Sequence, residues 1–143
     1  MYNFIKQLHS GWAYIAVLLL VFAVVNSLIG HFSKKEFTAK DRKIALFGLI
    51  GIHIQLLIGL IIYFVSEIGM KAFSTEGAMK IPELRLTMLE HPLVNIIAIA
   101  LITIGWSKHK KLTTSESKFK TISLFYGLGL LLVLSRIPWS LWF

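Results

Sequence analysis

The chain contains no cysteine, which excludes disulfide bonds and thiolate metal sites. Charged residues are also scarce: they make up 15% of the 143 residues, whereas 56% of the residues are hydrophobic. A water-soluble enzyme of this length needs more polar surface than this, and a disordered chain has far less hydrophobic sequence. The composition argues against both classes. The length allows one domain, which we place over residues 1–143.

Long apolar stretches dominate the sequence. There are four of them: Gly11–Phe32, Ile44–Ser66, Leu84–Trp106 and Thr121–Trp139. Each has about the 20 residues that a helix needs to cross a bilayer, and the alternating pattern of a membrane β-strand is absent. We therefore predict an all-α integral membrane four-helix bundle in contact with the lipid bilayer. The predicted helices cover about 3–32, 43–66, 83–107 and 120–140.

The positive charges are unevenly placed. The chain carries 15 basic and 7 acidic residues, a net charge of +8. Ten basic and three acidic residues fall in the segments 33–43 and 107–120, which a four-helix arrangement puts on one side of the membrane. The positive-inside rule places that side in the cytoplasm and both termini outside. We expect a multi-pass protein of the bacterial inner membrane, and no nucleic acid partner.

Ionisable side chains inside the membrane are costly and are therefore functional candidates. His9 lies near the outer end of the first predicted helix, and His53 lies near the middle of the second. His91 lies in the outer half of the third, and Arg136 lies near the outer end of the fourth. By contrast, we expect His109 to be solvated at the cytoplasmic boundary.

Three membrane histidines without cysteine indicate haem b. Neutral imidazole is a common axial ligand of haem iron, and a haem fits between the helices of a bundle. Arg136, together with Lys6 or Arg85, would neutralise the two propionates on the outer side. Zinc is the rival metal, because three histidines and a carboxylate would satisfy it. We rank zinc lower, because the expected depths of the histidines differ by several ångström.

The depth of each histidine limits which pair would hold a metal. At about 1.5 Å per helical residue, His53 lies deepest, and His9 and His91 lie at similar depths. We therefore predict His91 as one ligand and either His9 or His53 as the other. A stripe on the second helix points away from His53, and we interpret it as a helix-packing surface that the haem edge avoids. It consists of Gly48, Gly51, Gln55 and Gly59.

Other residues near His91 carry further expectations. Glu90 would orient an imidazole, pair with Arg136, or relay a proton to the outer side. Pro92 removes the helical hydrogen bond to the carbonyl of residue 88, so an irregular helix is expected there. The small residues Gly105 and Gly129 would let a flat ring or a neighbouring helix approach.

Four short motifs carry a resemblance that covers essentially the whole chain. They are His9–Trp12, His53–Gln55, Glu90–Leu93 and Ser135–Trp139. As an ordered set they resemble a family of small four-helix bacterial membrane proteins described as cytochrome b-like. More distantly, the layout is similar to cytochrome b561-type proteins and to membrane protoporphyrinogen oxidases that bind haem b. The resemblance implies a membrane-embedded haem held by helix side chains.

The expected function is haem b binding for electron transfer with a quinol or a protein partner. One alternative is a non-catalytic accessory subunit of a larger membrane complex, in which the histidines are hydrogen-bonded packing residues. Another is a haem-dependent porphyrinogen oxidase. Whether the chain is an enzyme stays open at this point.

Overall fold

The computed structural model describes residues 2–142, and it describes the side chains of residues 2–140. Met1 and Phe143, the ends of the predicted domain, lie outside the described residues. The four long helices are α1 (Tyr2–Phe32), α2 (Ala39–Val65), α4 (His91–Lys111) and α5 (Ser115–Ser135). Short helical segments complete the described part, which contains no strand: η1 (Met70–Ser74), η2 (Ala78–Lys80), α3 (Pro82–Arg85), η3 (Leu86–Glu90) and α6 (Trp139–Trp142).

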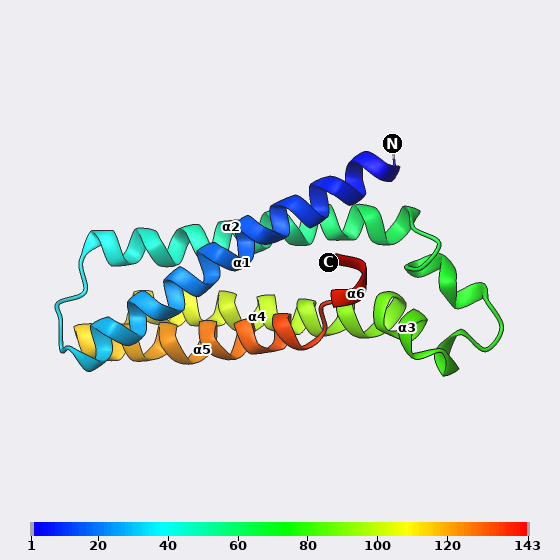
Figure 1. The fold of residues 1–143 in the computed structure, drawn as a ribbon. Coiled ribbons are helices and arrows are strands. Elements are labelled where there is room, and N and C mark those ends of the chain that lie inside the picture. The colour runs from blue at the N-terminus through cyan, green and yellow to red at the C-terminus, as the bar shows by residue number, and fades with distance from the viewer. Residues whose placement is uncertain (1, 143) are drawn as a thin grey trace.

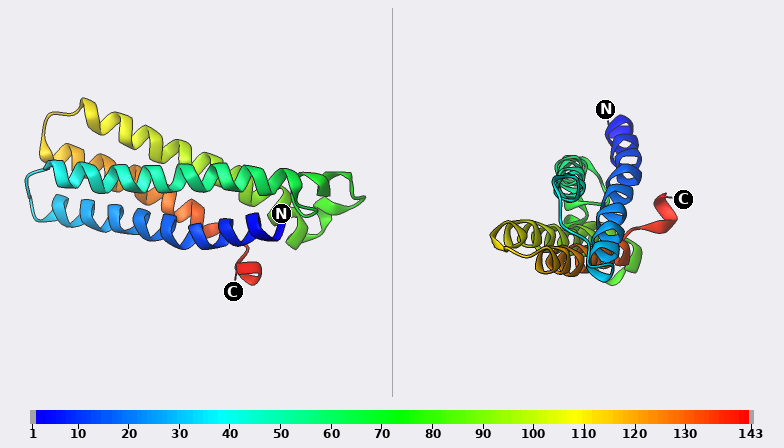
Figure 2. Two further views of the ribbon diagram at one scale, coloured as in Figure 1. Left: turned by 90° about the horizontal axis from the view of Figure 1, so that it is seen from above. Right: turned by 90° about the vertical axis from the view of Figure 1, so that its left-hand side faces the viewer.

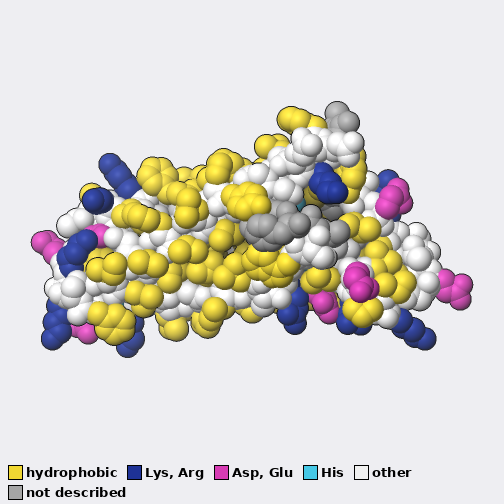
Figure 3. Space-filling view, in the orientation of Figure 1, with side chains coloured by type: hydrophobic (Ala, Val, Ile, Leu, Met, Phe, Trp, Pro, Cys, Tyr) yellow, Lys and Arg dark blue, Asp and Glu magenta, His cyan; other side chains and the backbone are white. Residues whose placement is uncertain are grey.

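Four helical segments are long and apolar enough to cross a membrane. They are Tyr2–Phe32, Ala39–Ser74, Pro82–Lys111 and Ser115–Ser135. Hydrophobic side chains cover the middle of the molecule in Figure 3, while Lys and Arg gather towards its two ends. The prediction of an all-α, membrane-spanning four-helix bundle is confirmed.

The helix boundaries differ from the predicted ones because polar residues cap the helices. The second helix begins at Ala39 rather than 43, since Thr38 and Asp41 form a capping box. The fourth helix begins at Ser115 rather than 120, since the side chain of Thr114 accepts a hydrogen bond from the Ser117 N–H. These caps extend both helices beyond the apolar stretches and into the basic segments.

The two ends of the bundle are built differently. We call the end with the loops 33–38 and 112–114 the basic end. The opposite end, which carries the N-terminus and the segment 66–81, is the cavity end. At the basic end α1 lies beside α5, and towards the cavity end it swings away from α5 and towards α2 (Figures 1 and 2). The space between α1 and α5 therefore widens like a wedge towards the cavity end (Figures 1 and 2).

Buried polar contacts close the basic end. Asp41 is 2% exposed, and its carboxylate accepts a hydrogen bond from Asn26 on α1 at 3.0 Å. The Tyr126 hydroxyl on α5 donates to the Ala45 carbonyl on α2 at 2.8 Å. His109 is also buried and donates from Nδ1 to the Trp106 carbonyl, so the expectation that it is solvated is wrong. These contacts tie α1, α2 and α5 together.

Glycines bring the helices close together in the middle of the bundle. Gly51 packs against Leu19 and Ala16 of α1, and Gly48 lies beside Ala23 of the same helix. On α4, Gly105 faces the Phe125 side chain of α5, where any larger residue would clash. Gly129 of α5 faces α4 in the same way. Of the two expectations for Gly105 and Gly129, a neighbouring helix rather than a flat ring fills the space.

The third span is irregular just before His91, as Pro92 led us to expect. The segment Leu86–Glu90 forms a π-helical turn, and the His91 N–H bonds to the Leu86 carbonyl, five residues earlier. Pro92 has no N–H to offer the Met88 carbonyl. The hydroxyl of Tyr63 on α2 donates to this carbonyl at 2.8 Å instead. A side chain from another helix thus satisfies the backbone at this depth.

Candidate functional site

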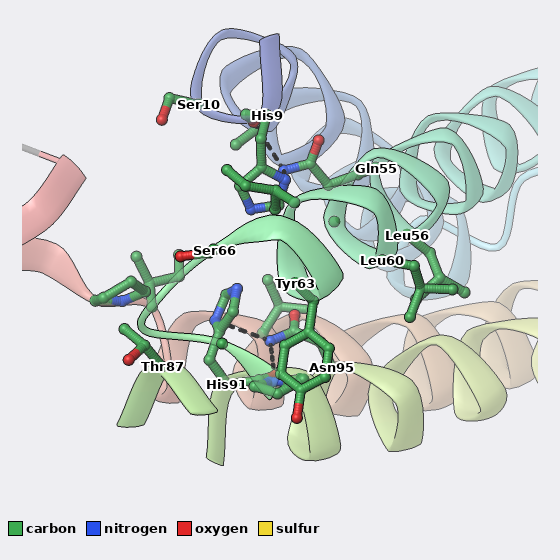
Figure 4. A pocket seen from close by; sticks show the side chains of 18 of the residues that line it. His9, Ser10, Gln55, Leu56, Leu60, Tyr63, Ser66, Thr87, His91 and Asn95 are labelled. Atoms are coloured by element: carbon green, nitrogen blue, oxygen red, sulfur yellow. Dashed lines mark hydrogen bonds between the residues drawn. The ribbon is translucent and has the colours of Figure 1, made fainter. Parts of the chain in front are cut away.

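A cavity of about 210 Å³ lies where the wedge opens, between α1, α2 and the start of α4. Most of its wall is apolar, with side chains such as Ala13, Leu56 and Ile99. Polar side chains from several elements also line it, as Figure 4 shows: His9, Ser10, Gln55, Tyr63, Ser66, Thr87, His91 and Asn95. Lys6 is the charged side chain that contributes to the lining. An apolar pocket with a few convergent polar groups is the usual form of a ligand site.

The imidazole rings of His9 and His91 face each other across this cavity (Figure 4). Their centroids are 6.3 Å apart, and the ring planes stand at 87° to each other. His9 comes from the first turns of α1 and His91 from the first residue of α4, so helices far apart in the sequence supply the two rings. In both rings Nδ1 makes the hydrogen bonds described next.

Two groups lie at Nδ1 of the His91 ring: the Arg136 carbonyl, which can only accept, and the Asn95 amide nitrogen, which is further away at 3.2 Å. Nδ1 of His91 lies 2.8 Å from the carbonyl oxygen of Arg136, which ends α5. A carbonyl has no hydrogen, so Nδ1 carries the proton and Nε2 carries the free lone pair. Asn95, one turn further along α4, donates its amide to the His91 carbonyl at 2.5 Å. The neutral tautomer of His91 is therefore the one that binds a metal through Nε2.

The His9 ring is held by Gln55 on α2. The Gln55 amide nitrogen donates to the His9 carbonyl at 2.9 Å and lies 3.1 Å from His9 Nδ1. One turn further along α2, Gly59 leaves room for the ring: a Cβ there would lie 3.2 Å from His9 Cε1. The predicted packing stripe thus divides. Gly48 and Gly51 pack against α1, whereas Gln55 and Gly59 contact His9 of α1 and also line the cavity, and the position of a haem edge relative to the stripe stays a prediction.

His53 lies elsewhere. Its Nδ1 donates to the Leu49 carbonyl of its own helix at 2.8 Å, and its Nε2 lies 3.4 Å from the Thr103 hydroxyl oxygen on α4. It does not belong to the cavity lining. The structure therefore brings His9 and His91 together and leaves His53 as a hydrogen-bonded residue between α2 and α4.

Arg136 contributes to the site through its backbone. Its carbonyl holds His91, while its guanidinium Nε lies 3.9 Å from the Glu90 carboxylate. Glu90 also accepts a hydrogen bond from Arg85 at 3.0 Å. Of the roles considered for Glu90, this geometry fits the pairing with Arg136. Lys6, rather than Arg136, is the cation at the cavity wall.

The separation of the two rings would leave room for a metal ion between them. Two metal–imidazole bonds of roughly 2 Å each, together with the radii of two five-membered rings, span about the observed centroid separation. At His91, the hydrogen bond from Nδ1 to the Arg136 carbonyl is the usual support of a histidine ligand. By contrast, no three His, Asp or Glu side chains among residues 2–140 form a group that could hold a metal ion. The described residues therefore do not present the ligand set of the zinc alternative.

Sequence reasoning missed two contributors to the site, Gln55 and Tyr63. Gln55 belongs to the motif His53–Gln55, but its place in a glycine stripe pointed to packing instead. Tyr63 lies near a helix end, which is typical of an interfacial anchor and does not point to this site, because its contact depends on the carbonyl that Pro92 leaves free. Comparison with known proteins adds nothing to this geometry: no family model, no curated protein and no solved structure matches the chain.

Proposed function

We propose that the chain binds haem b in the cavity, with His9 and His91 as axial ligands, and transfers electrons to or from a quinol or a protein partner. The single observation that carries the proposal is the facing of the two rings with centroids 6.3 Å apart. When bound, haem iron supplies one-electron chemistry by cycling between the ferric and ferrous states. Every other part of the function depends on residues of this chain.

In this proposal each of these residues has a separate role in binding the haem. Nε2 of each ring would hold the iron, and the Arg136 carbonyl keeps His91 in the required tautomer. Apolar side chains from three helices line the cavity and would shield a bound macrocycle from water. Lys6 would neutralise a propionate, since a buried anion needs a cationic partner. His53 has no ligand role in this proposal.

An optical spectrum tests the proposal directly. The full chain, purified in detergent and reconstituted with haem, should give the sharp visible band of reduced low-spin haem b. His9→Ala and His91→Ala should each abolish that spectrum, whereas His53→Ala should leave it intact. A wild-type protein that binds no haem would refute the proposal and favour the accessory subunit.

We also propose that the basic end faces the cytoplasm, which would place the cavity at the outer face of a bacterial inner membrane. The charges of the segments 33–43 and 107–120 support this orientation. A cysteine introduced at Thr113 should resist a membrane-impermeant thiol reagent in intact cells, and one at Ser74 should react. The reverse pattern would invert the orientation without affecting the ligand assignment.

A further inference from the structure

The two proposed ligands differ in the partners of their Nδ1 atoms, although a side-chain amide lies beside each of them. His91 Nδ1 lies 2.8 Å from the Arg136 carbonyl oxygen, which only accepts, and 3.2 Å from the Asn95 amide nitrogen, so the nearer partner takes the Nδ1 proton. His9 Nδ1 faces the amide nitrogen of Gln55, which donates. The orientation of this amide is fixed by its second bond, because the atom 2.9 Å from the His9 carbonyl oxygen must carry hydrogen. His9 Nδ1 therefore accepts, and the proton of neutral His9 lies on Nε2.

That tautomer cannot bind a metal through Nε2, because the lone pair it needs is on the other nitrogen. Of the two facing rings, His91 is prepared for ligation and His9 is not. The proton must leave Nε2 and a proton must be gained at Nδ1, with no net change in charge. Nδ1 then needs an acceptor where it now has a donor.

The Gln55 side chain itself contains a suitable acceptor, its Oε1 atom. The described residues contain two buried side-chain atoms without a hydrogen-bond partner, His31 Nδ1 at the basic end and Gln55 Oε1 beside the cavity. Turning the Gln55 amide about its last bond would exchange its two ends and bring Oε1 to His9 Nδ1. The turn gives up the bond to the His9 carbonyl, so the ligating arrangement lacks one contact that the present one has.

We infer that Gln55 is a positioning residue that sets the tautomer of His9, and with it whether His9 serves as a ligand. The inference rests on the proposed function, since the ligand role of His9 belongs to that proposal. It predicts unequal ligands: His91 is held ready, and His9 binds only when the Gln55 amide turns. Gln55→Glu should favour ligation by His9, because a carboxylate only accepts and so requires the proton on Nδ1.

The tautomers are tested without haem. The full chain is produced in cells that cannot make haem, labelled with nitrogen-15 at histidine, and its ring nitrogens are observed by NMR in detergent. Wild type should show His91 protonated at Nδ1 and His9 protonated at Nε2. Gln55→Glu should move the His9 proton to Nδ1, and Gln55→Leu should give a mixture of the two neutral His9 tautomers. His9 protonated at Nδ1 in the wild type, or unchanged in both variants, would overturn the inference.

Haem reconstitution then separates this inference from the proposed function. Gln55→Glu should keep low-spin haem at a lower midpoint potential than wild type, because a hydrogen bond from Nδ1 to an anion makes the ligand more basic. Gln55→Leu should raise the fraction of high-spin haem held by His91 alone. Low-spin spectra and potentials equal to wild type in both variants would refute the role of Gln55 and leave the haem proposal standing. Absence of haem from the wild type and from both variants would refute the haem proposal and the ligand role of His9. The NMR spectra of the haem-free protein would still show whether Gln55 sets the tautomer of His9.

Discussion

The basic end and the cavity end of this bundle are made from the same helices, but the helices are closely packed at the basic end and leave a cavity at the other. At the basic end, α1 reaches α5, and buried polar groups such as Asp41 and Tyr126 bond to neighbouring helices. At the cavity end the helices diverge, and polar side chains from α1, α2 and α4 face a gap. The difference shows that one end serves to hold the helices together, so that the other can keep space open.

The largest expected loss of stability comes from removing the polar contact that closes the basic end. Asp41→Ala removes the helix cap and strands the amide of Asn26, and we expect the free energy of unfolding to fall by about 3 kcal/mol. Unfolding by increasing denaturing detergent, followed by circular dichroism, measures this. The matched control is Glu67→Ala at the cavity end, whose carboxylate is 87% exposed and pairs with Lys71 at 3.7 Å. An exposed pair of this kind contributes less than about 1 kcal/mol. Equal losses in the two variants would contradict the division of roles.

This contrast also marks how far sequence reasoning reached. Hydropathy and charge were enough to predict the helices, but depth along the helix axis left both His9 and His53 as possible partners of His91. Depth does not tell which way a side chain points. His53 and Gln55 are two residues apart, which turns them about 200° from each other around α2. Gln55 therefore enters the cavity and His53 does not, and only the packing of α1 on α2 decides this.

Two alanines of α1 allow the packing density at two places along one helix to be compared. Ala23 is 1% exposed and lies against Gly48 of α2, whereas Ala13 lines the cavity. Ala23→Leu should lower the free energy of unfolding by about 2 kcal/mol through overpacking. Ala13→Leu should leave it unchanged within about 0.5 kcal/mol, because the added atoms enter open space.

The same pair has a second readout in ligand binding. Ala13→Leu should lower haem incorporation during reconstitution, since its side chain occupies part of the cavity. Ala23→Leu, measured at a temperature where it remains folded, should incorporate haem as the wild type does. A larger stability loss for Ala13→Leu than for Ala23→Leu would show that the cavity end is at least as tightly packed as the middle of the bundle.

The smallest expected effects concern two tyrosine hydroxyls. Tyr126 is fully buried at the basic end, but the Ala45 carbonyl that it contacts lies within a regular helix. Tyr63 is only half-buried, yet it bonds the Met88 carbonyl to which Pro92 offers no N–H. Tyr63→Phe should therefore cost about 1.5 kcal/mol and Tyr126→Phe about 0.5 kcal/mol, measured by the same unfolding assay. The opposite order would mean that burial of the hydroxyl outweighs the loss of the carbonyl's partner.

The π-helical turn before His91 has a consequence for comparing chains of different length. Arg85 and Glu90 form an ion pair at 3.0 Å although they are five residues apart. In an α-helix such pairs form at spacings of three or four residues. The π turn, with its hydrogen bonds to the fifth residue, brings this wider spacing onto one face. A homologous chain that lacks one residue between Pro82 and Glu90 would run here as a regular α-helix. A single-residue gap at this place in an alignment should then coincide with a basic residue four positions before the glutamate, where the ion pair is restored.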